Sequence, residues 1–135
     1  MNDTYGHEAG DLLLIEVAHR LKACVREMDT VARFAGDEFV VMLSALDSGS
    51  AQSTSQARIV AEKIRLSLSQ PYRLSIRDEG TATRAIEHRC TVSVGVALFT
   101  GHEGDADDIL QRADAAMYDA KEAGRNLIRF HDRLA

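Results

Sequence analysis

Cysteine, proline and long apolar runs are all scarce in this sequence. Its two cysteines, Cys24 and Cys90, stand alone and outside any CxxC pattern, so neither a disulfide scaffold nor a zinc site is indicated. No apolar run approaches the length of a membrane-spanning helix, and the first residues are polar rather than signal-like. We therefore expect a cytoplasmic protein, or the cytoplasmic part of a membrane-anchored parent.

The chain also lacks an excess of positive charge. Its formal net charge of -5 at pH 7 argues against a surface that binds a nucleic-acid polymer. Any phosphate group must therefore be bound by a local cluster of basic residues. A length of 135 residues, 45% of them hydrophobic, indicates a single soluble globular domain with a real core.

A β-hairpin is predicted around Gly36, because residues 31–34 and 39–43 are rich in β-branched and apolar residues. Glycine supplies the backbone freedom that a tight turn needs. The unusual feature is the adjacent acid pair Asp37 and Glu38 at the tip, since neighbouring carboxylates repel each other. Hard oxygen ligands on a rigid turn suit Mg²⁺, and Mg²⁺ suits a nucleoside triphosphate. Taken alone, the pair is also compatible with a solvated turn.

Apolar residues at helical spacing predict three helices. The first follows a polar loop over residues 1–11, the second ends at the only proline, Pro71, and the third spans about residues 106–123. The predicted buried faces are Leu14, Val17, Ala18, Leu21, Val25 and Met28 in the first helix, Ala57, Ala61, Ile64 and Leu68 in the second, and Ile109, Leu110, Ala113, Met117 and Ala120 in the third.

Residues 72–77 and 90–99 are predicted to be strands, joined as a hairpin by the mostly polar stretch 78–89, and residues 126–130 a last short strand. Gly95 within the second of these strands indicates a close backbone approach. The order of elements predicts an α+β fold, a mostly antiparallel sheet covered by helices.

Several polar residues have ordinary structural roles that stay open at this point. Asp11 lies where a carboxylate would cap the first helix, and His7 is typical of a loop residue that makes a hydrogen bond. Lys121 and Arg125 bracket the end of the third helix, where cations interact favourably with the helix dipole.

Four motifs occur in order along the chain. Asn2-Asp3 with Gly6-His7 and Gly10-Asp11 gives ND…GHxxGD, and residues 29–39 read DTVARFAGDEF. Residues 91–96 read TVSVGV, and residues 113–126 contain AD, Y, AK and GRN. Together they resemble the GGDEF domain, the catalytic domain of bacterial diguanylate cyclases.

The resemblance implies a fold like the palm of nucleotidyl cyclases and polymerases, with an antiparallel-rich sheet flanked by helices, over a single domain of residues 1–135. It implies a transferase of bacterial signalling that condenses two GTP into cyclic di-GMP and two pyrophosphates across a homodimer. Phosphoryl transfer mainly needs charge neutralisation and an in-line nucleophile. An upstream sensor domain in a longer parent protein is also implied.

The resemblance also implies a role for individual residues. Asp37 would bind Mg²⁺ (or Mn²⁺) and accept the 3′-hydroxyl proton, and Glu38 would assist metal binding. The backbone at Ala35 and Gly36 would lie close to the nucleotide. The other implied substrate-binding residues are Asn2, His7 and Asp11 for guanine and Lys121 and Arg125 for the phosphates.

Product inhibition is implied as well. Arg26-Glu27-Met28-Asp29 resembles the family's RxxD inhibitory site at the matching distance from Ala35, so Arg26 and Asp29 would bind cyclic di-GMP. Arg58 is a candidate for a second basic contribution to this allosteric site.

Two departures from the family pattern leave alternatives open. Ala35 stands where the family usually has glycine, from which we expect weakened catalysis. The chain also begins inside the ND motif, so the family's first strand and its metal-binding aspartate are expected to be missing, and a sheet edge left open could pair in a dimer. The alternatives are a degenerate domain that binds cyclic di-GMP or GTP without catalysis, and a dimerisation or docking element.

Overall fold

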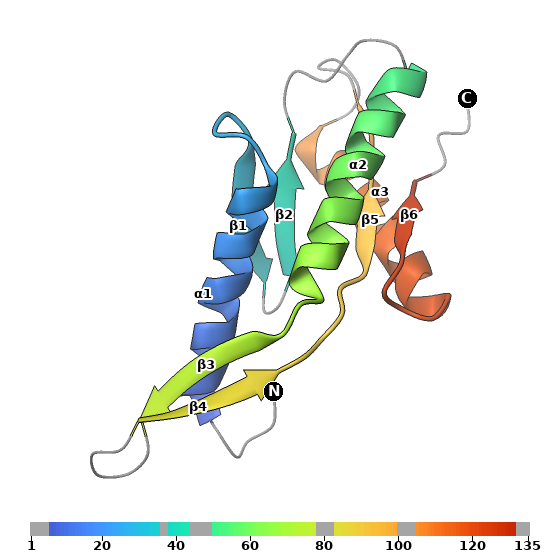
Figure 1. The fold of residues 1–135 in the computed structure, drawn as a ribbon. Coiled ribbons are helices and arrows are strands. Elements are labelled where there is room, and N and C mark those ends of the chain that lie inside the picture. Colours follow the sequence, from blue (N-terminus) through green and yellow to red (C-terminus); the bar gives the residue numbers. More distant parts are fainter. Residues whose placement is uncertain (1–5, 36–37, 44–49, 78–82, 100–104, 132–135) are drawn as a thin grey trace. The chain divides into compact units, whose positions relative to one another are not determined.

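The computed structural model describes residues 6–35, 38–43, 50–77, 83–99 and 105–131, coloured along the chain in Figure 1. The chain divides into two compact units, Met1–Ser44 with Ser67–Cys90 and Ala45–Leu66 with Thr91–Ala135. The first unit contains α1 (Gly6–Cys24), β1 (Thr30–Ala35), β2 (Glu38–Met42), β3 (Tyr72–Arg77) and β4 (Thr83–His88). The second contains most of α2 (Ser50–Leu68), with β5 (Val94–Val96), α3 (Ala106–Glu122) and β6 (Ile128–Phe130).

The predicted hairpin around the acid pair is confirmed in the first unit. β1 and β2 pair antiparallel from Thr30 opposite Met42 to Ala35 opposite Glu38, with an irregularity in the register between Arg33 and Ala35. The turn residues Gly36 and Asp37 lie outside the described residues. Within the described ranges β2 pairs with β1 only, so the pairing of an open edge in a dimer stays a prediction.

The first helix differs from the predicted one at both ends. It begins at Gly6, within the stretch predicted to be a polar loop, and it ends at Cys24. Met28, predicted on its buried face, lies beyond the end and is 60% exposed. The reason is a local turn, because the backbone N–H of Arg26 donates to Asp29 Oδ2 over 2.9 Å and that of Asp29 donates to the Arg26 carbonyl over 3.0 Å. A side chain that bonds nearby backbone in this way competes with the helix.

The hairpin partner predicted for β3 is wrong. β3 pairs with Thr83–His88, inside the stretch predicted to be a polar connection, rather than with residues 90–99. Five of the six β4 residues are polar, charged or exposed alanine, and the strand carries only Ile86 as a large apolar residue, opposite Leu74. Such a strand faces solvent over most of its length and so lacks the apolar alternation that sequence patterns detect.

Tyr72, in the first unit, is the largest fully buried side chain among the described residues, and its hydroxyl donates to the Leu68 carbonyl over 2.8 Å. The Arg20 guanidinium stacks on the Tyr72 ring at 3.8 Å from the centroid. It also donates to three carbonyls in the last turn of α2 and just beyond it, at 2.7–2.9 Å. Arg20 therefore ties α1 to the end of α2, where carbonyls have no partner within the helix itself. These carbonyls belong to Ser67, Gln70 and Pro71.

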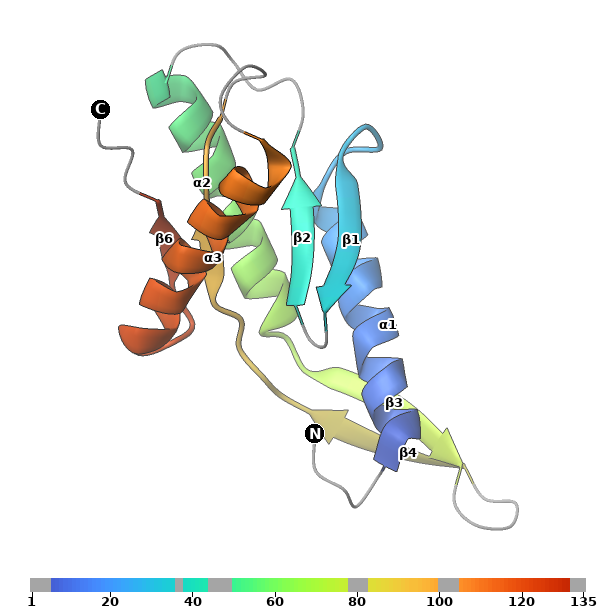
Figure 2. The ribbon, with the colours of Figure 1, turned by 180° about the vertical axis from the view of Figure 1, so that it is seen from behind.

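The second unit contains a parallel strand pair connected by a helix. β5 pairs with β6 from Val94 opposite Ile128 to Val96 opposite Phe130, and α3 is the crossover between them. Figure 2, which shows the ribbon from behind, shows α3 lying against both strands. A Cβ atom at Gly95 would overlap the Ala113 carbonyl oxygen and the Met117 amide nitrogen, so the predicted close backbone approach is confirmed.

Both ends of α3 follow from local sequence signals. Asp105 is the N-cap, and its carboxylate accepts from the Asp108 amide over 2.9 Å. At the other end the amide of Arg125 donates to the Ala120 carbonyl and the amide of Gly124 to that of Lys121. This is a Schellman motif, and Gly124, with φ 124°, occupies its left-handed position as predicted.

The predicted apolar stripe of α2 is buried at all four positions, which are Ala57, Ala61, Ile64 and Leu68. The fold is α+β as predicted, with two antiparallel pairs and one parallel pair among the described strands. No helix in the described ranges is long and apolar enough to cross a membrane.

Candidate functional site

The tip of the β1–β2 hairpin carries the predicted metal-binding pair. Glu38 is the first residue of β2 and is half-buried, opposite Ala35 at the end of β1. Its predicted partner Asp37, and Gly36 before it, lie outside the described residues. No group of three or more metal-ligating side chains occurs in the described part of the chain. Two adjacent carboxylates are nevertheless the hard oxygen donors that Mg²⁺ prefers, so the donor chemistry at this tip fits the ion.

The predicted guanine-binding residues lie at the N-terminal end of the chain. Asn2 is outside the described residues. His7 and Asp11 belong to the first two turns of α1, and Asp11 is exposed. Asp11 therefore lies inside the helix, which rules out the cap position that its place in the sequence had left open. A carboxylate on an exposed helix face remains able to accept hydrogen bonds from a ligand.

The predicted phosphate-binding pair lies at the C-terminal end of α3. Lys121 is half-buried in the last turn, and Arg125 follows the helix in a left-handed conformation with φ 65°. The Schellman motif brings the backbone of Arg125 back against that of Ala120, so both cations belong to one compact turn. Two cations carried by one turn give a local positive charge of the kind that an acidic chain would need to bind a polyphosphate.

Arg65 holds this turn in place and was not identified from the sequence. Its Nη1 donates to Asn126 Oδ1 over 2.9 Å, and its guanidinium also pairs with Glu62, three residues earlier on α2. The hydrogen bond from Arg65 lowers the pKa of the Glu62 carboxyl. The Glu62–Arg65 spacing is a sequence signal for a helix pair, but nothing in the sequence connects Arg65 to Asn126.

Glu122, which follows the predicted phosphate-binding residue Lys121 in the sequence, also has a hydrogen-bond partner. The Tyr118 hydroxyl donates to Glu122 Oε1 over 2.7 Å, and this hydrogen bond raises the pKa of the Tyr118 phenol. Because Glu122 directly follows Lys121, the bond gives its carboxylate a partner other than the two cations.

The predicted inhibitory residues Arg26 and Asp29 are brought together at the end of α1. Asp29 Oδ2 accepts from the Arg26 amide over 2.9 Å and from Arg26 Nε over 3.4 Å. The Asp29 side chain is 2% exposed, whereas that of Arg26 is 52% exposed. The buried carboxylate therefore fixes the base of the arginine while the guanidinium stays accessible.

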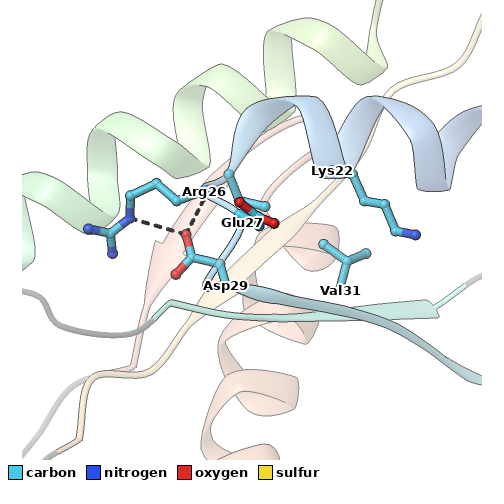
Figure 3. A pocket seen from close by; sticks show the side chains of 6 residues that line it. Lys22, Arg26, Glu27, Asp29 and Val31 are labelled. Carbon is cyan, nitrogen blue, oxygen red and sulfur yellow. Dashed lines mark hydrogen bonds and ion pairs between the residues drawn. The ribbon is translucent and has the colours of Figure 1, made fainter.

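A pocket of about 240 Å³ lies beside this pair (Figure 3). The sequence pattern had identified two of its lining residues, and the structure adds four. Lys22 comes from the last turn of α1 and Val31 from β1. The lining residues are Lys22, Val25, Arg26, Glu27, Asp29 and Val31.

Arg58, the predicted second allosteric arginine, belongs to α2 in the second unit. Its guanidinium stacks on the Phe130 ring at 4.6 Å from the centroid. A cation over an aromatic face is a favourable packing contact in its own right, so the contact supplies a structural role for Arg58. Its contribution to an allosteric site stays a prediction.

A family model described as "Diguanylate cyclase, GGDEF domain" matches residues 1–127. The chain is 44% identical over 126 residues, 93% of its length, to the bifunctional diguanylate cyclase/cyclic di-GMP phosphodiesterase MucR of Pseudomonas aeruginosa, and it covers 16% of that protein. It is 41% identical over 128 residues, 95% of its length, to diguanylate cyclase A of Treponema denticola, and it covers 31% of that protein. The chain therefore spans less than a third of these relatives.

Among solved structures, the GGDEF domain of PA1120 (YfiN or TpbB) from P. aeruginosa matches with a TM-score of 0.75 and 36% identity. The match covers 98% of this chain and 74% of that one. The chain belongs to the GGDEF domain family, and its fold is the palm-like cyclase fold of that family.

Proposed function

We propose that the chain is a diguanylate cyclase domain that condenses two molecules of GTP into cyclic di-GMP and two pyrophosphates across a homodimer. The observation that carries the proposal is the family match over residues 1–127 in a chain that retains the acid pair and the phosphate-binding pair. A domain that no longer turned over GTP would have little need of both pairs.

The reaction forms two phosphodiester bonds in the same way. The 3′-hydroxyl oxygen of one GTP attacks the α-phosphorus of the other, and the bond from that phosphorus to the β-phosphate bridging oxygen breaks, which releases pyrophosphate. The hydroxyl proton passes to the Asp37 carboxylate. Lys121 and Arg125 neutralise the charge on the phosphate oxygens, and in-line phosphoryl transfer depends chiefly on such neutralisation and positioning.

Asp37 and Glu38 are the residues that would hold Mg²⁺ or Mn²⁺, which when bound supplies further charge neutralisation on the triphosphate. Asn2 and Asp11 would recognise guanine, with His7 lining the same pocket. A carboxylate that accepts from the ring and exocyclic N–H groups of guanine finds no such pair of donors on adenine, which gives the preference for GTP.

Product inhibition would occur at Arg26 and Asp29. The support is the accessible guanidinium of Arg26, fixed by the buried Asp29 carboxylate and bordering a pocket. A guanidinium presents a planar fork of donors that matches phosphate oxygens or the acceptor edge of guanine. Cyclic di-GMP made by the domain would then lower its own rate of formation, with Arg58 as a further basic contributor.

The second candidate function is a catalytically degenerate domain that binds cyclic di-GMP. The pocket beside Arg26 and Asp29 favours this second function, because binding there needs no metal ion. The alanine at position 35 favours it as well. In either function we propose a cytoplasmic domain whose input comes from a sensor domain in a longer parent protein.

The experiment is incubation with GTP and Mg²⁺, with cyclic di-GMP measured by mass spectrometry. We expect product from the wild type and a loss of at least about 100-fold in rate for Glu38→Ala, because a carboxylate next to the reacting phosphates is removed. Glu87→Ala is the matched control, since Glu87 is exposed on β4. A wild type that makes no product but binds cyclic di-GMP, with binding lost in Arg26→Ala, would establish the binding module instead.

A further inference from the structure

The pocket beside the inhibitory pair has two cationic ends. In Figure 3 the Arg26 guanidinium and Asp29 lie on one side of the pocket, and the Lys22 side chain lies on the other, over Val31. Lys22 is four residues before Arg26, which places it about one helical turn earlier. The pocket therefore has one cation on each side, and the Glu27 carboxylate also lines it.

The Lys22 side chain differs from those of Arg26 and Asp29 in its bonding. Arg26 and Asp29 are bonded to each other. The Lys22 side chain is exposed and makes no hydrogen bond or ion pair to any residue in the described ranges, and the same holds for the Glu27 side chain. The Arg26 charge is partly neutralised by the buried Asp29 carboxylate. The Glu27 carboxylate, which also lines the pocket, offsets part of the Lys22 charge without forming an ion pair with it, so the Lys22 ammonium remains able to bind an incoming anion.

The walls and the size of the pocket limit what can enter. Val25 and Val31 are half-buried and supply an apolar surface suited to a flat base. The volume of about 240 Å³ is below the roughly 300–1,000 Å³ of pockets that enclose a drug-sized ligand. A cyclic dinucleotide would thus insert one base and leave its phosphates at the mouth, where both cations are exposed.

We propose that Lys22 is a phosphate-binding residue of this pocket, which receives one guanine nucleotide unit of cyclic di-GMP with its base against Val25 and Val31. The inference rests on the proposed inhibitory site and adds to it a residue outside the RxxD motif. Arg26 binds from one side of the mouth and Lys22 from the other, so the phosphates lie between two cations.

Lys22 also has an ordinary structural role, since a cation in the last turn of a helix interacts favourably with the helix dipole. The two roles differ in what they affect. A dipole interaction changes the stability of the chain and leaves the affinity of the folded protein for a ligand unchanged. A phosphate contact changes the affinity and its dependence on salt.

The test is isothermal titration of cyclic di-GMP into the wild type and into Lys22→Ala, Lys22→Arg, Lys63→Ala and Arg26→Ala. Lys63 is the matched control, an exposed helical lysine that does not line the pocket. We expect Lys22→Ala to raise the Kd about three- to tenfold, as suits one partly exposed charged contact, and Arg26→Ala to raise it more than about tenfold. Lys22→Arg should retain most of the affinity.

Salt provides the second readout. The difference between wild type and Lys22→Ala should shrink as the ionic strength rises, while Lys63→Ala should match the wild type throughout. Equal affinities for Lys22→Ala and Lys63→Ala, with binding still lost in Arg26→Ala, would overturn the role of Lys22 and leave the inhibitory site standing. A wild type that binds no cyclic di-GMP would overturn both.

Discussion

Replacing Arg20 by alanine should destabilise the chain far more than the loss of an exposed charged side chain from the same unit. The Arg20 side chain is 16% exposed and donates to three carbonyls at and beyond the end of α2 while it stacks on Tyr72. The bonds to Ser67 and Pro71 are partly buried, whereas the bond to Gln70 is exposed and water can replace it.

The magnitude follows from the two partly buried bonds. A hydrogen bond that involves a charged group contributes about 1.5–3 kcal/mol, and the two bonds share one guanidinium, so the lower value applies to each. Stacking on Tyr72 adds about 0.5–1 kcal/mol. We therefore expect Arg20→Ala to lower the free energy of unfolding by about 3.5–4 kcal/mol, a large share of the roughly 5–15 kcal/mol typical of a native domain. For a chain of this size the melting temperature would fall by about 10 °C.

The assay is urea and thermal unfolding followed by circular dichroism. Arg20→Lys should recover part of the loss, because an ammonium keeps the charge but cannot reach three carbonyls as a planar fork does. Arg73→Ala is the control, since Arg73 is exposed on the neighbouring strand and its loss should change stability by less than about 0.5 kcal/mol. A loss below about 1 kcal/mol for Arg20→Ala would refute the reasoning.

Two further predictions concern packing and pH. Gly95→Ala should lower the free energy of unfolding by about 3 kcal/mol or prevent folding, because the new methyl group overlaps the α3 backbone, which cannot move aside. Gly10→Ala, in a helix with open space around the residue, should instead raise the free energy of unfolding by about 1 kcal/mol. Equal urea midpoints for the two variants would contradict this prediction. Burial raises the pKa of Tyr72 from 10.0 to about 12, so its contribution to stability is complete below pH 10 and is lost as the pH rises toward 12. The urea midpoint should therefore fall more over this pH range in the wild type than in Tyr72→Phe. Parallel plots of urea midpoint against pH for the two proteins would contradict this prediction.

The elements that could be predicted from sequence are those with local signals. The hairpin around Gly36 lies between two apolar runs, and its strands occupy the expected residues. The third helix has an acidic cap at Asp105 and a left-handed glycine at Gly124, and both act within a few residues of the helix end. Such signals depend on neighbours in the sequence and survive without knowledge of the tertiary fold.

The features that sequence reasoning missed depend on distant partners. The partner strand of β3, Thr83–His88, is mostly polar and so gives no apolar pattern from which its pairing could be predicted. Arg20 is an ordinary charged residue on a helix until the end of α2 comes within reach of its guanidinium. Lys22 is likewise an ordinary lysine in the last turn of a helix when the sequence alone is considered. It becomes a candidate binding residue only because Val31 of β1 lines a pocket beside it.

Alanine at position 35, where the family usually has glycine, is the last residue of β1 and pairs with Glu38, next to the irregularity in the register. A residue that pairs in a strand has no general need of glycine, because extended backbone suits any L-residue. On the proposed function the added methyl group would lie beside the nucleotide and would weaken the affinity for GTP, while the sequence keeps the acid pair Asp37 and Glu38. We therefore propose a slower cyclase rather than a domain that has lost its reaction.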